Sequence, residues 1–158
     1  MRKRCYFWLF LYFLGAGEVE NPPIVNIWVE GNSLIPEEEI LKAAEISPGM
    51  PYDATVLLQA MDKIYNMGYF LTKPEFMPFP SPEGVQIEIR VREYPIISSI
   101  EFLHLISLPA QKLKSVMQLQ EGKIFNSRTM EEDVQRINEE FEKAGYLASQ
   151  VVRSRIDP

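Results

Sequence analysis

The chain has 158 residues, of which 46% are hydrophobic and 24% are charged, which is the composition of an ordinary globular protein rather than a disordered one. The formal net charge is −6 and no long basic run follows the N-terminus, which argues against nucleic acid and anionic membrane surfaces as partners of the body of the protein. An internal repeat divides the chain into two units of roughly 75 residues, a size at which one core is only marginally stabilising.

The first seventeen residues are typical of a secretory signal peptide. Arg2–Arg4 form a positive start, Cys5–Leu14 is an apolar run of ten residues, and Gly15–Gly17 supplies the small residues needed near a cleavage site. A spanning helix needs about 20 apolar residues, so an uncleaved anchor is the weaker alternative. We predict that residues 1–17 are removed on export, with the exact cleavage site left open. The mature chain then has a net charge of −9 and no cysteine.

The next stretch predicts a strand and a short helix. Ile24–Glu30 alternates apolar side chains and reads as a strand with partial burial on both faces, and Gly31 and Asn32 turn the chain. Pro36 then opens a short helix at its first position. The acidic run Glu37–Glu39 falls in the first turn, where carboxylates complement the helix dipole, so we interpret it as a solvated helix start rather than a metal or acid–base cluster.

A longer helix is predicted between Gly49 and Gly68. Asp53 is its expected N-cap, because a short side-chain oxygen there accepts from an amide of the first turn. An apolar stripe marks one face of this helix: Leu57, Met61, Ile64 and Met67. Gly68 occupies the left-handed position that ends helices, and we expect Tyr69 to pack back on the helix.

Two strands complete the first unit. Tyr69–Phe79 contains Pro74 and Pro78, which a central strand does not tolerate, so it is predicted to be an edge strand. Val85–Arg92 alternates apolar and polar side chains and is predicted to bury one face. The first unit is therefore β-α-α-β-β, with two helices on one side of a three-stranded sheet, and the fold class is α+β.

The second half repeats this order. We predict a strand at Ile96–Leu103, a short helix at Pro109–Met117, a long helix at Ser127–Ala144 and a strand at Tyr146–Ile156. The long helix begins after a second N-cap, Asn126, and carries its own apolar stripe: Met130, Val134, Ile137, Phe141 and Ala144. The sequence ends before a counterpart of Val85–Arg92, so we expect the second unit to lack its last strand and the chain to be a fragment.

The register of the repeat supports this division. Adding 73 to the residue number carries one set of prolines, glycines and apolar residues onto the other, for example Gly49 onto Gly122, and beyond the long helix the offset becomes 77. The four extra residues are about one helical turn, which keeps the apolar stripe on one face. The residues that define the fold are Gly31, Asn32, Gly49, Gly68, Tyr69, Pro95, Gly122, Gly145 and Tyr146.

No reactive constellation is apparent in the sequence. His104, the single histidine, has no Cys, Ser or second His nearby, and no glycine-rich phosphate loop or metal-spaced Cys/His set occurs. A small secreted enzyme using paired carboxylates such as Glu88 and Glu93 is one hypothesis, but strand alternation places those two on opposite faces. We therefore expect no catalytic, cofactor-binding or metal-binding residues.

Three runs together support a family resemblance: Ile27-x-Val29-x-Gly31-Asn32, Tyr65-x-x-Gly68-Tyr69-Phe70, and Val91-x-Glu93-x-Pro95-x-Ile97-x-x-Ile100-x-Phe102. In order, spacing and duplication they resemble the polypeptide-transport-associated (POTRA) domains of BamA-type outer-membrane assembly proteins and two-partner secretion transporters. The resemblance covers Glu20 to Ile156, with residues 20–93 as the first domain and 94–158 as the second, C-terminally truncated one. It departs from the family where His104-Leu105 replaces Gly-Asn.

The resemblance implies tandem periplasmic domains that precede a membrane β-barrel and bind unfolded outer-membrane proteins or accessory assembly subunits. An unpaired strand edge offers a physical route, because backbone groups bind extended peptides with little regard to their side chains. Pro74 interrupts the edge of the first unit. The second unit supplies the predicted peptide-binding edge: Tyr146, Leu147, Ala148, Ser149, Gln150, Val151, Val152 and Arg153.

A second hypothesis keeps the fold and assigns it to the cell-division complex, as in FtsQ-like scaffold proteins. That role needs Cys5–Leu14 as a membrane anchor, and the run is too short for one.

Overall fold

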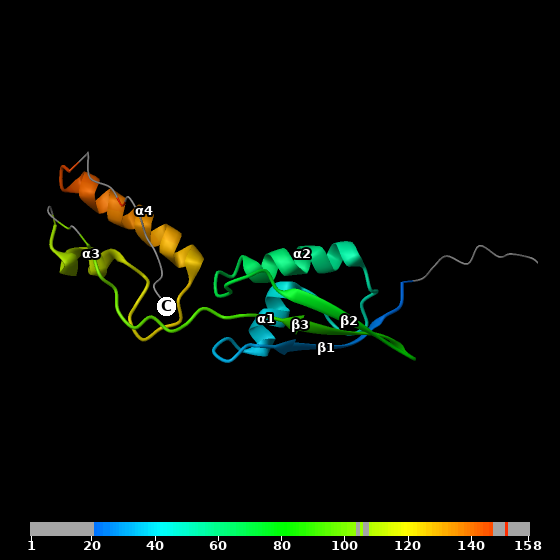
Figure 1. Cartoon of the computed structure of the whole chain (residues 1–158). Helices are drawn as coiled ribbons and strands as arrows, with labels where there is room; N and C mark the ends of the chain where they lie inside the picture. Colours follow the sequence, from blue (N-terminus) through cyan, green and yellow to red (C-terminus); the bar gives the residue numbers. More distant parts are fainter. Residues whose placement is uncertain (1–20, 104, 106–107, 147–150, 152–158) are drawn as a thin grey trace, which may run out of the picture.

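The computed structural model describes residues 21–103, 105, 108–146 and 151. The predicted signal peptide and His104 lie outside these residues. The elements in chain order are β1 (Ile24–Glu30), α1 (Glu37–Ala44), α2 (Ala54–Tyr65), β2 (Glu75–Ser81), β3 (Gly84–Arg90), α3 (Ala110–Val116) and α4 (Ser127–Lys143). They form two units that lie end to end, with the sheet, α1 and α2 in the first and α3 and α4 in the second (Figure 1).

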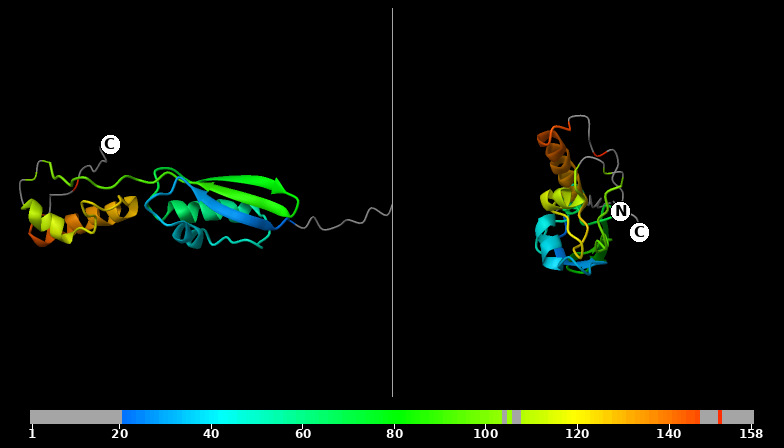
Figure 2. Two further views of the ribbon diagram at one scale, coloured as in Figure 1. Left: turned by 90° about the horizontal axis from the view of Figure 1, so that it is seen from below. Right: turned by 90° about the vertical axis from the view of Figure 1, so that its left-hand side faces the viewer.

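The first unit has the predicted β-α-α-β-β order. Its sheet has the strand order β1-β3-β2, with β1 parallel and β2 antiparallel to the central strand β3. Both helices lie on one face of this sheet (Figure 2). The predicted α+β class and the two tandem units are confirmed, and so is the edge position of the proline-containing strand.

The core of the first unit lies between the helices and the inner face of the sheet. Ile40 from α1, Ile64 from α2, and Ile87 and Ile89 from β3 each have 0% of their surface exposed. Phe70, just after α2, is 1% exposed and joins the same cluster, and Tyr69 packs against it as expected. The alternation read from the sequence of β3 therefore places its apolar row in the core.

The helix ends follow the local rules that predicted them. The side chain of Asp53 accepts a hydrogen bond from the Thr55 amide at 2.7 Å, and that of Asn126 accepts from the Thr129 amide at 3.0 Å. Gly68 and Gly145 have φ of 82° and 84°, the left-handed conformation that ends a helix without a steric penalty only at glycine.

The repeat extends to individual backbone hydrogen bonds. In each unit an isoleucine just after the proline lead-in pairs with the loop that precedes the longer helix. The bonds in the first unit are Ile24 N–H to Met50 O at 2.8 Å and Gly49 N–H to Ile24 O at 2.7 Å, and those in the second are Ile97 N–H to Lys123 O and Gly122 N–H to Ile97 O, both at 2.8 Å. The residues that make these bonds correspond one to one between the units: Ile24 to Ile97, Gly49 to Gly122 and Met50 to Lys123. The numbers in each pair differ by 73, which confirms the register of the repeat over this stretch.

The predicted strand Ile96–Leu103 is wrong. Its pairing is limited to an isolated bridge between Ile96 and Ile124, and Ile96 and Leu103 are 51% and 71% exposed. Its counterpart β1 is extended because β3 forms a ladder with it. Among the described residues of the second unit, no strand takes the place of β3, so apolar alternation alone does not produce a strand here.

The bounds of the first edge strand also differ from the prediction. We expected Tyr69–Phe79, whereas β2 begins at Glu75. Phe70 forms an isolated bridge with Glu93, and the Leu71 amide donates to the Arg92 carbonyl at 2.8 Å. The buried Pro74 lies between this short pairing and β2, so the extended segment is interrupted where proline removes a donor.

The second core is small. Leu113 from α3 and Ile137 and Phe141 from α4 are its buried members. Three other positions of the predicted α4 stripe are less enclosed, since Met130 and Val134 are half-buried and Ala144 is exposed.

One buried residue of α4 is a carboxylate that the apolar stripe did not predict. Asp133 is 1% exposed and accepts hydrogen bonds from the amides of Gln118 and Leu119, each at 2.8 Å, and from Arg136 at 2.7 Å. It therefore fixes the turn after α3 against α4. No helix within the described ranges combines the length and hydropathy required to cross a bilayer.

Candidate functional site

The candidate binding features of the first unit are the two edges of its sheet. In the order β1-β3-β2, one side of β1 and one side of β2 have no neighbouring strand in the described part of the chain. Such edges present unpaired amides and carbonyls to extended peptides, and many proteins blunt them with prolines or charged side chains.

The edge of β2 is blunted by proline. Pro78 and Pro80 pair with Ile87 and Val85 of β3, and proline fits an edge strand where its nitrogen faces away from the neighbouring strand. Alternate residues of a strand face the same side, so Phe76, Pro78 and Pro80 form the outward row of β2. Only Phe76 in this row retains an amide hydrogen, which makes the β2 edge a poor acceptor of another strand.

The edge of β1 is closed at its two ends. At the start, the amide of Ile24 donates to the Met50 carbonyl and its carbonyl accepts from the Gly49 amide. At the end, the Val29 amide donates to Oε1 of Glu37, the first residue of α1, at 3.2 Å. The stretch between these contacts contains no proline.

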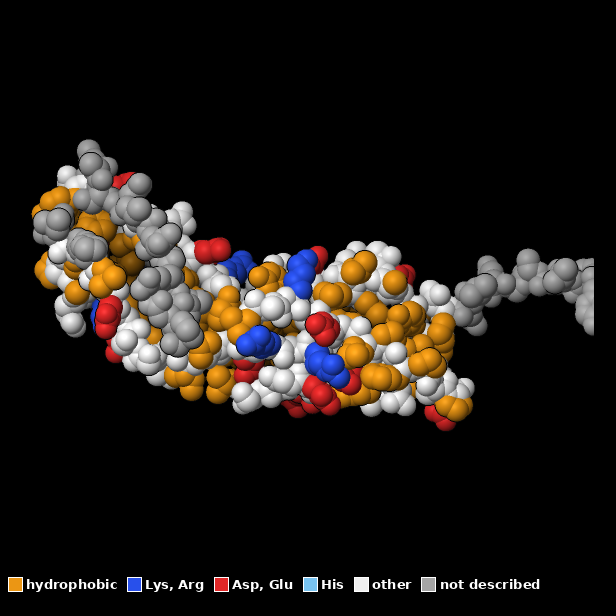
Figure 3. Space-filling model, viewed as in Figure 1, with side chains coloured by type: hydrophobic (Ala, Val, Ile, Leu, Met, Phe, Trp, Pro, Cys, Tyr) orange, Lys and Arg blue, Asp and Glu red, His pale blue; other side chains and the backbone are white. Residues whose placement is uncertain are grey.

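The outer face of the sheet carries an aromatic pair. Trp28 of β1 and Phe79 of β2 are stacked, with ring centroids 5.9 Å apart and planes inclined by 20°. Hydrophobic side chains gather over the half of the first unit that is farther from the second unit (Figure 3). Phe79 itself is 41% exposed.

The polar row of β3 departs from the prediction of a simple outward face. Glu88 is only 6% exposed, because its register partners Trp28 and Met77 flank it on the two neighbouring strands. Its Oε1 lies 2.7 Å from Nε of Arg90, which is an ion pair although the alignment is not that of a hydrogen bond. Burial by flanking strands is a tertiary effect that alternation along one strand does not reveal.

Glu93, the other carboxylate of the enzyme hypothesis, holds a loop. It accepts hydrogen bonds from the amides of Leu34 and Ile35, at 2.9 Å and 2.8 Å, and from the Ser33 hydroxyl at 3.0 Å. Partial burial raises the pKa of Glu93, but the hydrogen bonds from Ile35, Leu34 and Ser33 together outweigh it, so its pKa lies below the usual value. These contacts fix the turn that follows β1.

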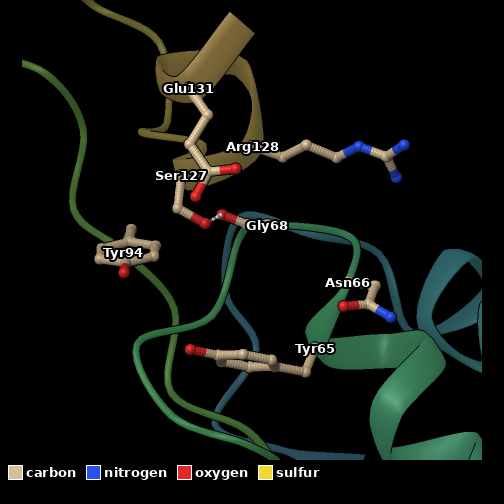
Figure 4. A pocket seen from close by; sticks show the side chains of 7 residues that line it. All are labelled: Tyr65, Asn66, Gly68, Tyr94, Ser127, Arg128 and Glu131. Atoms are coloured by element: carbon tan, nitrogen blue, oxygen red, sulfur yellow. Dashed lines mark hydrogen bonds between the residues drawn. The ribbon is translucent and has the colours of Figure 1, made fainter.

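The joint between the units is a third feature. The Gly68 carbonyl, just after α2, accepts from the Ser127 amide at 2.8 Å and from the Ser127 hydroxyl at 3.2 Å. The Met67 carbonyl accepts from Nδ2 of Asn126 at 2.7 Å, while Oδ1 of the same side chain caps α4. Figure 4 shows the first turn of α4 against Gly68, with the Ser127 hydroxyl directed at the glycine carbonyl.

Apolar packing reinforces this joint. The rings of Tyr94 and Phe125 meet edge to face with centroids 4.8 Å apart, and Ile124 packs against the core of the first unit. An open hollow of about 510 Å³ lies beside these contacts, lined by Tyr65, Asn66, Gly68, Tyr94, Ser127, Arg128 and Glu131. The fold-defining Gly68 is therefore a residue of the joint as well as a helix end, a role that its position in the repeat did not predict.

The predicted peptide-binding edge lies mostly outside the described residues. Only Tyr146 and Val151 of that set are described: Tyr146 is 40% exposed with its amide donating to the Phe141 carbonyl, and the Val151 amide donates to Oδ1 of Asn138 at 2.8 Å. Leu147, Ala148, Ser149, Gln150, Val152 and Arg153 lie outside. Within the described residues, no group of three or more His, Cys, Asp or Glu side chains is arranged to hold a metal ion.

The sequence matches one family model twice. The model is described as POTRA, surface antigen variable number repeat, and the matches span residues 22–94 and 95–158. Among curated proteins, the chain is 21% identical over 137 residues to the outer membrane protein assembly factor BamA of Nitratidesulfovibrio vulgaris. That match covers 86% of this chain and 17% of the relative, so the chain spans about a sixth of the relative's length.

Solved structures share the fold. The N-terminal domain of Omp85 from Thermosynechococcus elongatus superimposes with a TM-score of 0.75 and 27% identity, over 85% of this chain and 57% of that one. The first two POTRA domains of the periplasmic domain of Omp85 from Anabaena give a TM-score of 0.61 at 23% identity, over 85% of this chain and 88% of that one. At 23% identity, the similarity to the Anabaena structure supports a shared fold alone.

Proposed function

The chain belongs to the POTRA family, and from this premise we propose that it is a periplasmic polypeptide-binding scaffold of an outer-membrane β-barrel protein assembly or secretion factor. The partners are unfolded or partly folded outer-membrane proteins, or accessory assembly subunits. The role is one of binding and not of catalysis, and it requires no cofactor.

The proposed mode of binding is the addition of a client strand to a sheet edge. Clients of this kind differ in sequence and share a tendency to form strands, which suits recognition through backbone hydrogen bonds. The choice of site follows from the blunted β2 edge: the outward row of β2 contains Pro78 and Pro80, whereas the predicted edge Tyr146–Arg153 contains no proline. We therefore assign client binding to Tyr146–Arg153.

Paired proline substitutions test this assignment. Neighbouring residues of a strand direct their backbone groups to opposite sides, so one of the two variants Ala148→Pro and Ser149→Pro removes a donor from the outer edge. Loss of one backbone hydrogen bond of about 1 kcal/mol weakens binding of a labelled strand peptide roughly fivefold, as measured by fluorescence anisotropy. Ala148→Ser and Ser149→Ala, which keep the amide, are the matched controls. Equal binding by all four variants would rule out this edge.

A further inference from the structure

The outer edge of β1 differs from that of β2 in having no proline. Ile24–Glu30 forms a continuous strand on the side of the sheet opposite β2, and its one irregularity lies between Ile24 and Asn26. The protection of this edge therefore comes from other parts of the chain, and those contacts decide whether a further strand can be added.

The direction of the backbone groups follows from two hydrogen bonds. The Glu30 carbonyl accepts from the Val91 amide at 2.9 Å and so faces β3, while the Val29 amide donates to Glu37 and faces away. Ile27 is two residues before Val29 and faces the same way. The amide and carbonyl of Ile27 and the carbonyl of Val29 therefore point away from β3, at the free edge of the sheet. The described residues beyond this edge form no hydrogen bond with them.

Glu37 closes this edge through a contact that is easily replaced. Its distance of 3.2 Å from the Val29 amide is at the long end for an N–H···O hydrogen bond. The side chain is exposed at the start of α1, so it can rotate into water without burying a charge. By contrast, the closure at Ile24 uses backbone groups of the Gly49–Met50 turn and moves only with that turn.

The charge of Glu37 determines which strand fits. When a carbonyl of an added strand accepts the hydrogen bond of the Val29 amide, it displaces the carboxylate of Glu37. This carboxylate then lies beside the new strand without its own hydrogen bond. Glu38 and Glu39 follow it and are exposed, so the first turn of α1 carries three carboxylates. A lysine or arginine on the added strand pairs with this carboxylate, whereas an acidic residue is repelled.

Resting on the proposed function, we propose that the β1 edge is a second strand-accepting site, that Glu37 gates it, and that its occupant is an extended segment of another polypeptide carrying a basic side chain beside Glu37. The β1 site selects among clients by their charge. The proposed edge at Tyr146–Arg153 differs, because it binds clients through their backbone groups.

A titration followed by amide NMR tests this site in the mature chain. Three strand peptides of equal length differ at one residue, which is Lys, Gln or Glu. We expect the Lys peptide to shift and protect the amides of Ile27 and Val29 and to bind roughly threefold more tightly than the Glu peptide. Glu37→Gln abolishes the preference and retains binding, while Glu38→Gln, a matched loss of charge one residue away, retains most of the preference.

The outcomes separate this inference from the proposed function. Shifts confined to Tyr146–Arg153 overturn the β1 site and leave the proposed function standing. No shift at either edge, with any peptide, overturns both. A lysine preference that persists in Glu37→Gln contradicts the gate. Protection of Ile27 that rises with protein concentration in the absence of peptide makes a second copy of this chain the occupant and contradicts the proposed partner.

Discussion

The two units share one sequence pattern and differ in how completely it becomes a sheet. In the first, β1 pairs with β3 from Ile24 to Glu30 with one irregularity before Asn26, and fourteen buried residues form the core. In the second, the matching stretch Ile96–Leu103 has one isolated bridge, and the described core has three buried residues. The hydrogen bonds that the units share join the segment after the proline lead-in to the loop before the longer helix, and both units also share the side-chain cap of that helix. These contacts repeat with the sequence, whereas a strand ladder also requires a neighbouring strand.

The largest expected effect is on the larger core. Phe70→Ala removes a side chain that is 1% exposed, and its expected loss is about 3–5 kcal/mol of the free energy of unfolding. Phe141→Ala, at 7% exposure in the smaller core, is expected to cost less, because that site can collapse or admit water. Urea unfolding combined with hydrogen exchange resolves the two units. Phe79→Ala, exposed at 41%, is the control and should change stability by less than about 1 kcal/mol. Equal losses in the two cores would contradict the comparison.

The second unit also depends on a buried carboxylate, that of Asp133, in addition to its small apolar core. Asp133→Ala leaves the amides of Gln118 and Leu119 without their acceptor and should cost about 1–3 kcal/mol, because unsatisfied buried donors are penalised. Asp133→Asn retains one acceptor oxygen and should lose less. Hydrogen exchange at Gln118 and Leu119 reports the change directly, and unaltered protection in Asp133→Ala would contradict the role given to this carboxylate.

A pair of glycine variants separates strain from contact at the joint. Gly68→Ala adds a Cβ that would clash with Oδ1 of Asn126, whereas at Gly49 a Cβ meets nothing within 4 Å. Both have positive φ, 82° and 93°, so each variant carries a similar backbone penalty of about 1–2 kcal/mol. Only Gly68→Ala should also change the relative orientation of the units, as measured by residual dipolar couplings. An orientation change of equal size in Gly49→Ala would contradict the contact.

The smallest effect is a pH dependence confined to the first unit. The pKa of Glu93 is lowered in the folded state by its hydrogen bonds to the loop 33–35, in spite of partial burial. Its contribution to stability is therefore present above the unfolded pKa and is lost as pH falls through the lowered folded value. Glu93→Gln should flatten stability against pH in the acid range below the unfolded pKa of about 4.3, measured by thermal unfolding at constant ionic strength. An unchanged slope would show that other carboxylates dominate acid unfolding.

Features set by neighbouring residues could be predicted from the sequence. Asp53 and Asn126 were identified as helix caps and Gly68 and Gly145 as helix ends, because each role depends on a few adjacent residues. The order of elements in the first unit followed from the same kind of evidence together with hydrophobic spacing.

Features that depend on distant parts of the chain could not be predicted in this way. Glu88 is buried by strands on either side of β3, although strand alternation predicted it on the open face, and Asp133 is buried by the turn after α3, at a position outside the apolar stripe. Glu37 is a similar case, because its place in the first turn of a helix predicted only a solvated side chain, whereas it accepts a hydrogen bond from the Val29 amide of β1. For the edge Tyr146–Arg153, the assignment remains a prediction.

The side chain of Asn126 couples the stability of the second unit to that of the first. One end of its amide starts α4 and the other is held by the Met67 carbonyl at the close of α2. When α2 unfolds, the Asn126 side chain loses this acceptor, and the first turn of α4 loses a contact that holds its cap in place. We expect opening of the first unit to lower the protection of the amides at the start of α4.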